Sequence, residues 1–463
     1  MIISEQKRLP EGLRAIFRKL EASPLATRFA RGVFWSLFGS VTSRVLAVIS
    51  SIIAARLIGK SAFGELGIVQ NTIAMVGTLA GFGLGTTALK YVAEFRGQDS
   101  RRTGRMIALF RVAAWGTGTI LGVLLVGIAP WLCRSILKQP DLTGYVQIGS
   151  LLMLFSAVNG SQNGVLSGFE AFKTIARVTT IGGLLNFPMI VGGALYAGLP
   201  GIVCALILGQ MVACLLNAHA LRLEMIRHNI PLTFIGWTRE LPVLWQFSVP
   251  AVLGTLVISP VTWACTAMLV RQPHGLEHMG AFNAANQWFN ALMWLPYMMD
   301  QAVLPILSER FGAKDRTQTS ILLFGLIKLN AAIAIPLVLI GGLLSPYIMG
   351  GYGTGFVGEW PTLVAMLATA GLFAIQLPVG NVIAASGRMW LGLCLNLTWS
   401  VVFISASWFL VGWGSLGLAI ARFLAYVAQA IWSFAYAITA VKELGAAPVT
   451  GIEAVPVQTG SQP

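Results

Sequence analysis

Twelve apolar stretches, each long enough to cross a bilayer, fill this chain almost from end to end. About 20 apolar residues span the hydrocarbon core as a helix, because a helix rises about 1.5 Å per residue. Only 10% of the 463 residues are charged, whereas soluble domains carry about 25%. The predicted spans are residues 31–57, 65–92, 106–132, 143–168, 175–197, 200–221, 241–270, 278–307, 319–345, 361–385, 389–411 and 415–441.

The membrane itself restricts the fold class. A segment inside a bilayer must satisfy its own backbone hydrogen bonds, which leaves only helices and closed barrels. Barrel strands would give weak, alternating segments of about 10 residues, whereas these stretches are long and continuously apolar. We therefore expect an all-α polytopic membrane protein with about twelve transmembrane helices.

The basic residues are distributed unevenly between the two sides of the predicted bundle. If the N-terminus is cytoplasmic, only five of the 31 Lys and Arg residues fall in the odd-numbered loops and four lie inside spans, while all the others lie in the N-terminal tail and the even-numbered loops. This is the positive-inside distribution, and it predicts that both termini are cytoplasmic. Insertion orientation thus explains the net charge of +14, and no nucleic-acid partner is expected.

A weak internal repeat divides the spans into two halves of six. The sequence AEFRGQD at 93–99 has a counterpart, SERFGAKD, at 308–315, and VLSG at 165–168 has a counterpart, AASG, at 384–387. Because six is an even number of spans, both halves have the same orientation, as in parallel transporter repeats. Chance similarity of small residues at helix ends is the alternative.

The repeat predicts a transporter-like division of the chain into two six-helix lobes. An N-terminal segment at 7–20 has apolar residues at helical spacing among basic ones, which is typical of an amphipathic helix on the inner leaflet or of a simple basic flank. The predicted units are a cytoplasmic basic segment at 1–30, a first lobe at 31–222, a cytoplasmic linker at 223–240, a second lobe at 241–441 and a disordered tail at 442–463.

The eighth span carries a continuous polar stripe at steps of three and four residues. Such a stripe is costly against lipid and must face other helices or water. We expect it to line a central cavity and bind a polar substrate; interhelical hydrogen bonding is the alternative. Asn71, near the start of the second span, joins the same set of candidates. The stripe consists of Asn283, Asn286, Gln287, Asn290, Trp294, Tyr297, Asp300 and Gln301.

Intramembrane charges are few and mostly positive. Arg44 lies near the middle of the first span, where its guanidinium can hold a phosphate in bidentate fashion or pair with Asp300 or helix-end carbonyls. Lys328 and Arg422 are either cavity cations or snorkelling side chains. Asp300 is the one carboxylate well inside a span. It is a candidate for H⁺ or Na⁺ coupling or, equally, a salt-bridge partner of Arg44 or Lys328, and the positive balance favours an anionic substrate.

Several motifs resemble one known family. ARLIGKSAFG at 55–64, GFGLG at 81–85, YVAE at 91–94 and SGFEAFK at 167–173 resemble the polysaccharide transporter branch of the MATE-like flippase superfamily, which includes the Wzx-type O-antigen and exopolysaccharide flippases. The resemblance covers about residues 30–440 and is densest in the first 180. The second-lobe motifs are degenerate, and the amide stripe has no fixed counterpart in the family.

This resemblance implies a V-shaped, two-lobed bundle with a central cationic cavity. Such proteins move undecaprenyl-pyrophosphate-linked oligosaccharides from the cytoplasmic to the periplasmic leaflet of the bacterial inner membrane, without covalent chemistry or a cofactor. Polymerase and export machinery are the implied partners. Arg44 is the first candidate for the pyrophosphate contact.

Two other functions compete with this interpretation. One is a multidrug or lipid II exporter of the same superfamily, although the lack of a carboxylate well inside any first-lobe span disfavours drug–cation antiport. The other is a membrane glycosyltransferase or polymerase. Such enzymes generally need a long loop with acidic and basic residues, whereas the longest predicted extracytoplasmic loop, near 345–360, holds a single carboxylate, Glu359.

Overall fold

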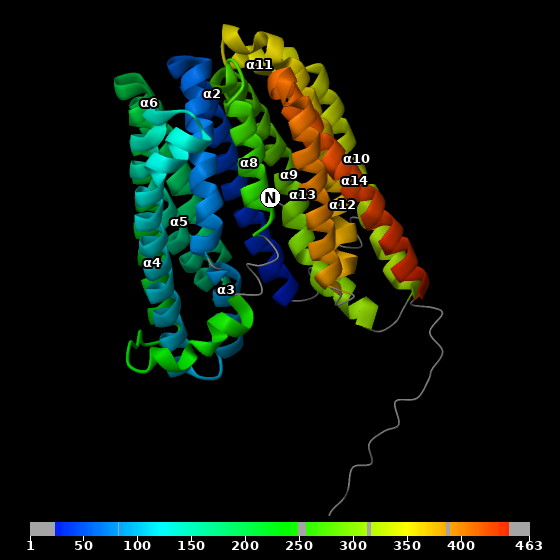
Figure 1. Ribbon diagram of the computed structural model, residues 1–463. Helices are drawn as coiled ribbons and strands as arrows, with labels where there is room; N and C mark the ends of the chain where they lie inside the picture. The colour runs from blue at the N-terminus through cyan, green and yellow to red at the C-terminus, as the bar shows by residue number, and fades with distance from the viewer. Residues whose placement is uncertain (1–23, 82, 249–255, 313–315, 386–388, 444–463) are drawn as a thin grey trace, which may run out of the picture.

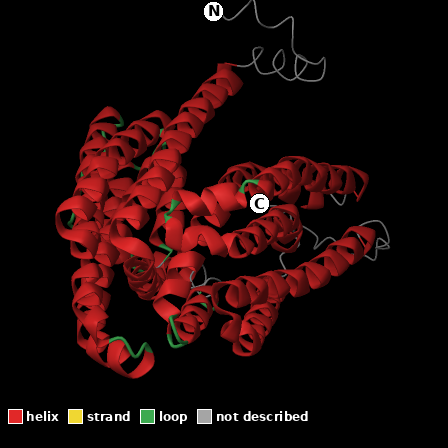
Figure 2. Cartoon of the chain, turned by 90° about the horizontal axis from the view of Figure 1, so that it is seen from above, coloured by secondary structure: helices red, strands yellow, loops and turns green. Residues whose placement is uncertain are grey.

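The computed structural model describes residues 24–81, 83–248, 256–312, 316–385 and 389–443 (Figure 1). The predicted amphipathic helix at 7–20 and nearly all of the predicted tail lie outside these ranges. All regular elements in the described ranges are helical (Figure 2), which confirms the predicted fold class. The principal helices of the first half are α2 (Pro24–Gly81), α3 (Leu84–Phe95), α4 (Ser100–Trp131), α5 (Thr143–Gly168) and α6 (Phe172–Arg227).

Short helical turns complete the first half, and longer helices follow in the second. The turns are η2 (Leu132–Ile136), η3 (Pro140–Leu142), η4 (Trp237–Glu240) and η5 (Leu244–Ser248). The second half contains α8 (Ile258–Val270), α9 (Gly275–Gly312), α10 (Arg316–Leu343), α11 (Ser345–Gly351), η6 (Thr354–Glu359), α12 (Trp360–Ala385), α13 (Met389–Leu410), η7 (Val411–Trp413) and α14 (Gly414–Glu443).

Seven stretches of the described chain are long and apolar enough to cross a membrane. Some are too long to cross only once: α6 has 56 residues, or about 84 Å of straight helix against a hydrocarbon core of about 30 Å. Gly198 interrupts α6 at φ 59°, and Gly59 interrupts α2 at φ 82°. These backbone angles favour glycine, and each lets one long helix fold back on itself. The number of twelve spans stays a prediction.

The helices form two groups, which we call the first lobe (α2–α6) and the second lobe (α8–α14) (Figure 1). The two lobes turn at glycines in equivalent places. Gly198 and Gly414 both have positive φ, and three residues later Gly201 and Gly417 each lie against a backbone carbonyl. A Cβ built on Gly201 would meet the Gly193 oxygen at 2.0 Å, and one on Gly417 would meet the Leu410 oxygen at 1.8 Å.

Charged residues mark the two ends of the bundle. The Gly59 end holds Gly59, Lys60 and Glu359, and the Arg102 end holds Arg102 and Glu240. Asp99 caps α4 at the Arg102 end, where its side chain accepts a hydrogen bond of 2.9 Å from the backbone N–H of Arg102. α4 therefore begins at the Arg102 end, next to several basic residues.

The segment after α6 packs under the first lobe. Glu240 accepts hydrogen bonds of 3.3 Å from both Arg102 and Arg105, and Ile230 and Val243 are buried in one cluster with Phe110. The predicted start of the second lobe at residue 241 stays a prediction, and in the structure the buried Val243 side chain packs with residues of the first lobe. The Ser248 hydroxyl, 2.8 Å from that of Thr87, extends this attachment.

The lobes meet closely at the Gly59 end. Gly64 of α2 and Gly280 of α9 lie backbone to backbone, because a Cβ on Gly64 would come within 1.8 Å of the Leu276 oxygen. The fully buried Phe63 ring packs against the rings of Tyr352 and Phe356. A side chain of the first lobe therefore fills an aromatic socket in the second.

Candidate functional site

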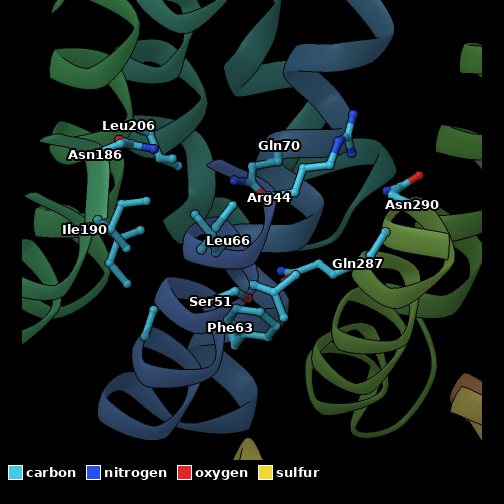
Figure 3. A pocket seen from close by; sticks show the side chains of 15 residues that line it. Arg44, Ser51, Phe63, Leu66, Gln70, Asn186, Ile190, Leu206, Gln287 and Asn290 are labelled. Carbon is cyan, nitrogen blue, oxygen red and sulfur yellow. The ribbon is translucent and has the colours of Figure 1, made fainter. Parts of the chain in front are cut away.

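A cavity of about 280 Å³ lies between the lobes. Its walls come from α2, α6 and α9, and Figure 3 shows their side chains converging from the three helices. Among its lining residues, Arg44 carries the one formal charge, and four carboxamides accompany it. The polar lining residues are Arg44, Ser51, Gln70, Asn186, Gln287 and Asn290.

Arg44 projects from α2 as an exposed side chain. Its guanidinium carbon lies 5.8 Å from the centre of the Trp294 ring on α9, within the range of a cation–π contact. Among the described residues Arg44 forms no ion pair. A contact with a ring face uses none of the guanidinium N–H groups as hydrogen-bond donors, so they can bind an anionic ligand.

The predicted polar stripe on α9 divides between two environments. Gln287 and Asn290 line the cavity, and Figure 3 shows Gln287 reaching toward Ser51 and Phe63. Asn286 instead accepts a hydrogen bond of 2.8 Å from Arg422 inside the second lobe. Asn283 is buried against α2, where a Cβ on Gly67 would lie 3.0 Å from its side chain.

Arg422 lies apart from Arg44. Its guanidinium packs 4.2 Å from the centre of the Phe289 ring, and within the described part of the chain its buried Nε has no hydrogen-bond partner. Tyr297, from the predicted stripe, stacks edge-on against Phe373, which in turn contacts Tyr426. Arg422 is thus a cation held among aromatic rings of the second lobe and does not line the cavity between the lobes.

The remaining predicted residues also lie away from this cavity. Asp300 accepts a hydrogen bond of 2.5 Å from Asn381, and within the described chain it pairs with neither Arg44 nor Lys328. Lys328 is exposed, and Asn71 does not line the cavity. Their roles in substrate binding and ion coupling stay predictions.

Sequence reasoning missed Asn186 as a wall of the cavity. It lies in the apolar span at 175–197, two residues before Pro188, and a single amide in such a span gives no periodic signal. An intramembrane amide beside a helix-distorting proline is the clue that was available.

Known proteins resemble this chain along most of its length. It is 22% identical over 430 residues to the EPS I polysaccharide export inner membrane protein EpsE of Ralstonia solanacearum, covering 91% of this chain and 94% of that one. It is 20% identical over 293 residues to the lipid III flippase of Escherichia coli, covering 62% of this chain and 69% of the relative.

Solved structures share the fold. An inward-facing multidrug resistance MATE family transporter of the MOP superfamily aligns with a TM-score of 0.72 at 16% identity, covering 89% of this chain and 99% of that structure. This likeness confirms the predicted MATE-like fold.

Family models agree with these similarities. A MatE model matches residues 250–409, in the second lobe. The model described as polysaccharide biosynthesis protein matches residues 29–311, which is more than half of the chain and includes the first-lobe motifs identified in the sequence. The chain therefore belongs to the polysaccharide biosynthesis protein family, and its fold is MATE-like.

Proposed function

We propose that this protein is a flippase that moves a polyprenyl-pyrophosphate-linked oligosaccharide from the cytoplasmic to the periplasmic leaflet of a bacterial inner membrane. The observation that carries the proposal is the Arg44 cavity. Arg44, which has no ion-pair partner among the described residues, lies among carboxamides in a cavity lined by both lobes. A guanidinium holds phosphate oxygens in bidentate fashion, and amides bind sugar hydroxyls.

The relatives support the same substrate class. Their names describe polysaccharide export and lipid III flipping. A lipid-linked saccharide joins an anionic phosphate group to a polar glycan and a long apolar tail. The cavity between the two lobes can hold the phosphate group and the glycan while the apolar tail stays in lipid.

The orientation of the bundle is part of the proposal. Arg96, Arg102 and Arg105 lie at the Arg102 end, and the positive-inside distribution of basic residues in the sequence predicts that this end is cytoplasmic together with both termini. The lobes touch at the Gly59 end, which is then the periplasmic side. An inward-facing resting conformation fits these contacts, and alternating access requires them to break.

A drug exporter is the second candidate, because the second lobe matches the MatE model and the fold is shared with a multidrug transporter. The cavity argues against cationic drugs. Its one formal charge is positive, and a cation brought beside Arg44 would be repelled in a medium of low dielectric constant.

Translocation in proteoliposomes tests the proposal. We expect the wild type to move a polyprenyl-pyrophosphate oligosaccharide, Arg44→Ala to lose this activity and Arg44→Lys to keep part of it, because lysine retains the charge without the bidentate geometry. Arg134→Ala, at an exposed arginine outside the cavity, is the matched control. Movement of cationic dyes without movement of the lipid would overturn the proposal in favour of a drug exporter.

Two predicted features stay part of this proposal. Asp300 is the candidate for H⁺ or Na⁺ coupling, held by the Asn381 amide. Polysaccharide polymerase and export machinery are the predicted partners downstream of the flipped lipid. Neither feature is needed for the test of Arg44.

A further inference from the structure

A second cavity, of about 320 Å³, lies inside the first lobe between α2, α5 and the two halves of α6. Its volume falls within the range of small-molecule sites, about 300–1,000 Å³. Half of its lining is polar, and none of the lining residues is charged. Its carboxamides are Asn159, Asn163, Asn186, Gln210 and Asn217.

Hydrogen bonds join some of these amides to one another but leave a buried amide oxygen unpaired within the described chain. Asn159 donates to the Gln210 backbone carbonyl at 3.0 Å and to the Gln210 side-chain oxygen at 2.8 Å. Asn217 donates to Asn159 at 3.2 Å. The Asn217 side chain is almost fully buried, at 2% exposure, yet its Oδ1 has no hydrogen-bond partner among the described residues. A buried acceptor without a donor is costly, so this oxygen is suited to a donor brought by a ligand.

Structural bonding between helices does not account for the whole cluster. Asn159 and Gln210 do join α5 to α6. Asn163, however, lines the cavity without a hydrogen bond to any described residue. Interhelical bonding needs paired amides, whereas this cavity presents amide groups beyond those pairs.

The chemistry of the lining selects an uncharged polar ligand. Carboxamides offer both donors and acceptors, which matches hydroxyl groups that do the same. A cation or a phosphate in this cavity would lack a counter-charge among the lining residues and would be penalised by desolvation. The second cavity therefore differs in ligand class from the Arg44 cavity.

The two cavities adjoin. Asn186 and Leu206 line both, and Ser43, which lines the second, directly precedes Arg44. The Ser43 hydroxyl donates to the Thr179 carbonyl at 2.7 Å and so ties α2 to α6 at the boundary. One ligand with an anionic part and a neutral part can lie across this shared wall.

We propose that the amide-lined cavity of the first lobe is a subsite for uncharged sugar residues of the translocated lipid, next to the phosphate contact at Arg44. This assignment rests on the proposed flippase function. It goes beyond that function by separating glycan recognition from phosphate recognition and placing it within a single lobe.

Gly182 offers a way to fill the cavity without removing a hydrogen bond. It lines the cavity, and a Cβ built on it meets nothing within 4 Å, so Gly182→Leu projects into the cavity from an unperturbed helix. Gly192→Leu, on the same half of α6, is the matched control because Gly192 is equally unobstructed but lines neither cavity.

The experiment compares two fluorescent lipids in proteoliposomes: a polyprenyl pyrophosphate with a neutral trisaccharide and the same lipid without sugar. We expect Gly182→Leu to slow the saccharide lipid by about tenfold or more while the bare lipid moves at the wild-type rate. Asn163→Ala should shift the ratio of the two rates in the same direction. Asn330→Ala, which removes a buried amide bonded to the Ala374 carbonyl in the second lobe, should leave the ratio unchanged.

The outcomes separate the two proposals. If Gly182→Leu affects both lipids equally, or neither, the sugar subsite is overturned while the flippase function stands. If wild-type protein moves neither lipid, the flippase function fails, and the subsite fails with it.

Discussion

The Lys60 ammonium group lies 2.7 Å from the Glu359 carboxylate, and in the described chain this is the one ion pair that joins the two lobes. Glu359 also accepts a hydrogen bond of 2.5 Å from Ser415 at the start of α14. Its carboxylate is therefore fixed on the second lobe, and Lys60 reaches it from the first. Both side chains are mostly buried, so the pair is less screened than a surface one.

Breaking this pair should favour opening at the Gly59 end. Lys60→Ala leaves the buried Glu359 carboxylate without its cation, which costs free energy only in the closed arrangement. We expect spin labels at the exposed positions Arg56 and Val357 to show longer distances in Lys60→Ala than in the wild type. Lys60→Glu combined with Glu359→Lys should restore the short distances.

The control for this prediction is Arg96→Ala, which breaks an ion pair with Glu170 within the first lobe. It should leave the distance distribution unchanged. Unchanged distances in Lys60→Ala would show that the aromatic and glycine contacts alone hold the Gly59 end closed.

A side chain introduced at Gly64 should open the Gly59 end more than Lys60→Ala does. A Cβ at this position would lie 1.8 Å from the Leu276 oxygen, so Gly64→Val cannot exist in the closed arrangement unless α2 and α9 move apart. We expect this variant to populate the form open at the Gly59 end and to lose transport. Gly127→Val is the control, because a Cβ on Gly127 meets nothing within 4 Å; a fully active Gly64→Val would contradict the close helix contact.

Trp294 should act as a positioning residue for Arg44. Its ring faces the guanidinium at 5.8 Å, and cation–π contacts at accessible sites contribute about 0.5–1 kcal/mol. Trp294→Leu should therefore raise the KM for the lipid-linked substrate by about two- to fivefold, with Trp294→Phe in between. A change in kcat alone, with KM unaffected, would indicate a role in the conformational cycle instead.

Replacing Asp300 should show whether this residue couples transport to an H⁺ or Na⁺ gradient. If its carboxylate binds H⁺ or Na⁺, Asp300→Asn should still allow downhill flipping but should no longer respond to an imposed pH or Na⁺ gradient. The measurement is the initial flipping rate with and without each gradient. Asp141→Asn, in the short η3 turn, is the control, and a retained gradient response in Asp300→Asn would remove this residue from the coupling role.

Hydropathy along the sequence predicts the fold class, but the sequence predicts only part of the candidate site. Long apolar spans require helices whatever their neighbours are, so the fold class was predictable. The α9 stripe was recognised as polar, yet adjacent residues project about 100° apart around a helix axis. Gln287 therefore faces the cavity between the lobes while Asn286 turns to Arg422. The spacing of residues along one helix does not show which neighbouring helix or cavity each face of that helix will contact.

The amides of the first lobe were harder to foresee for a related reason. Asn159, Asn186 and Gln210 come from separate apolar spans and form a cluster only when α5 packs against both halves of α6. No local pattern links them. Arg44 was predictable because a cation near the middle of a span is costly against lipid and so marks a candidate site by itself.

The attachment of the segment after α6 has a consequence for biosynthesis. Ile230 and Val243 complete the buried cluster around Phe110, so the first lobe draws part of its core from beyond its last membrane helix. Since N-terminal units fold first as a chain emerges from the ribosome, the first lobe has all of these core residues only once the chain has grown past η5. α6 therefore inserts before the core of the first lobe is complete. A nascent chain stalled at this stage would leave the apolar side chains around Phe110 exposed to the chaperones and proteases of the cell.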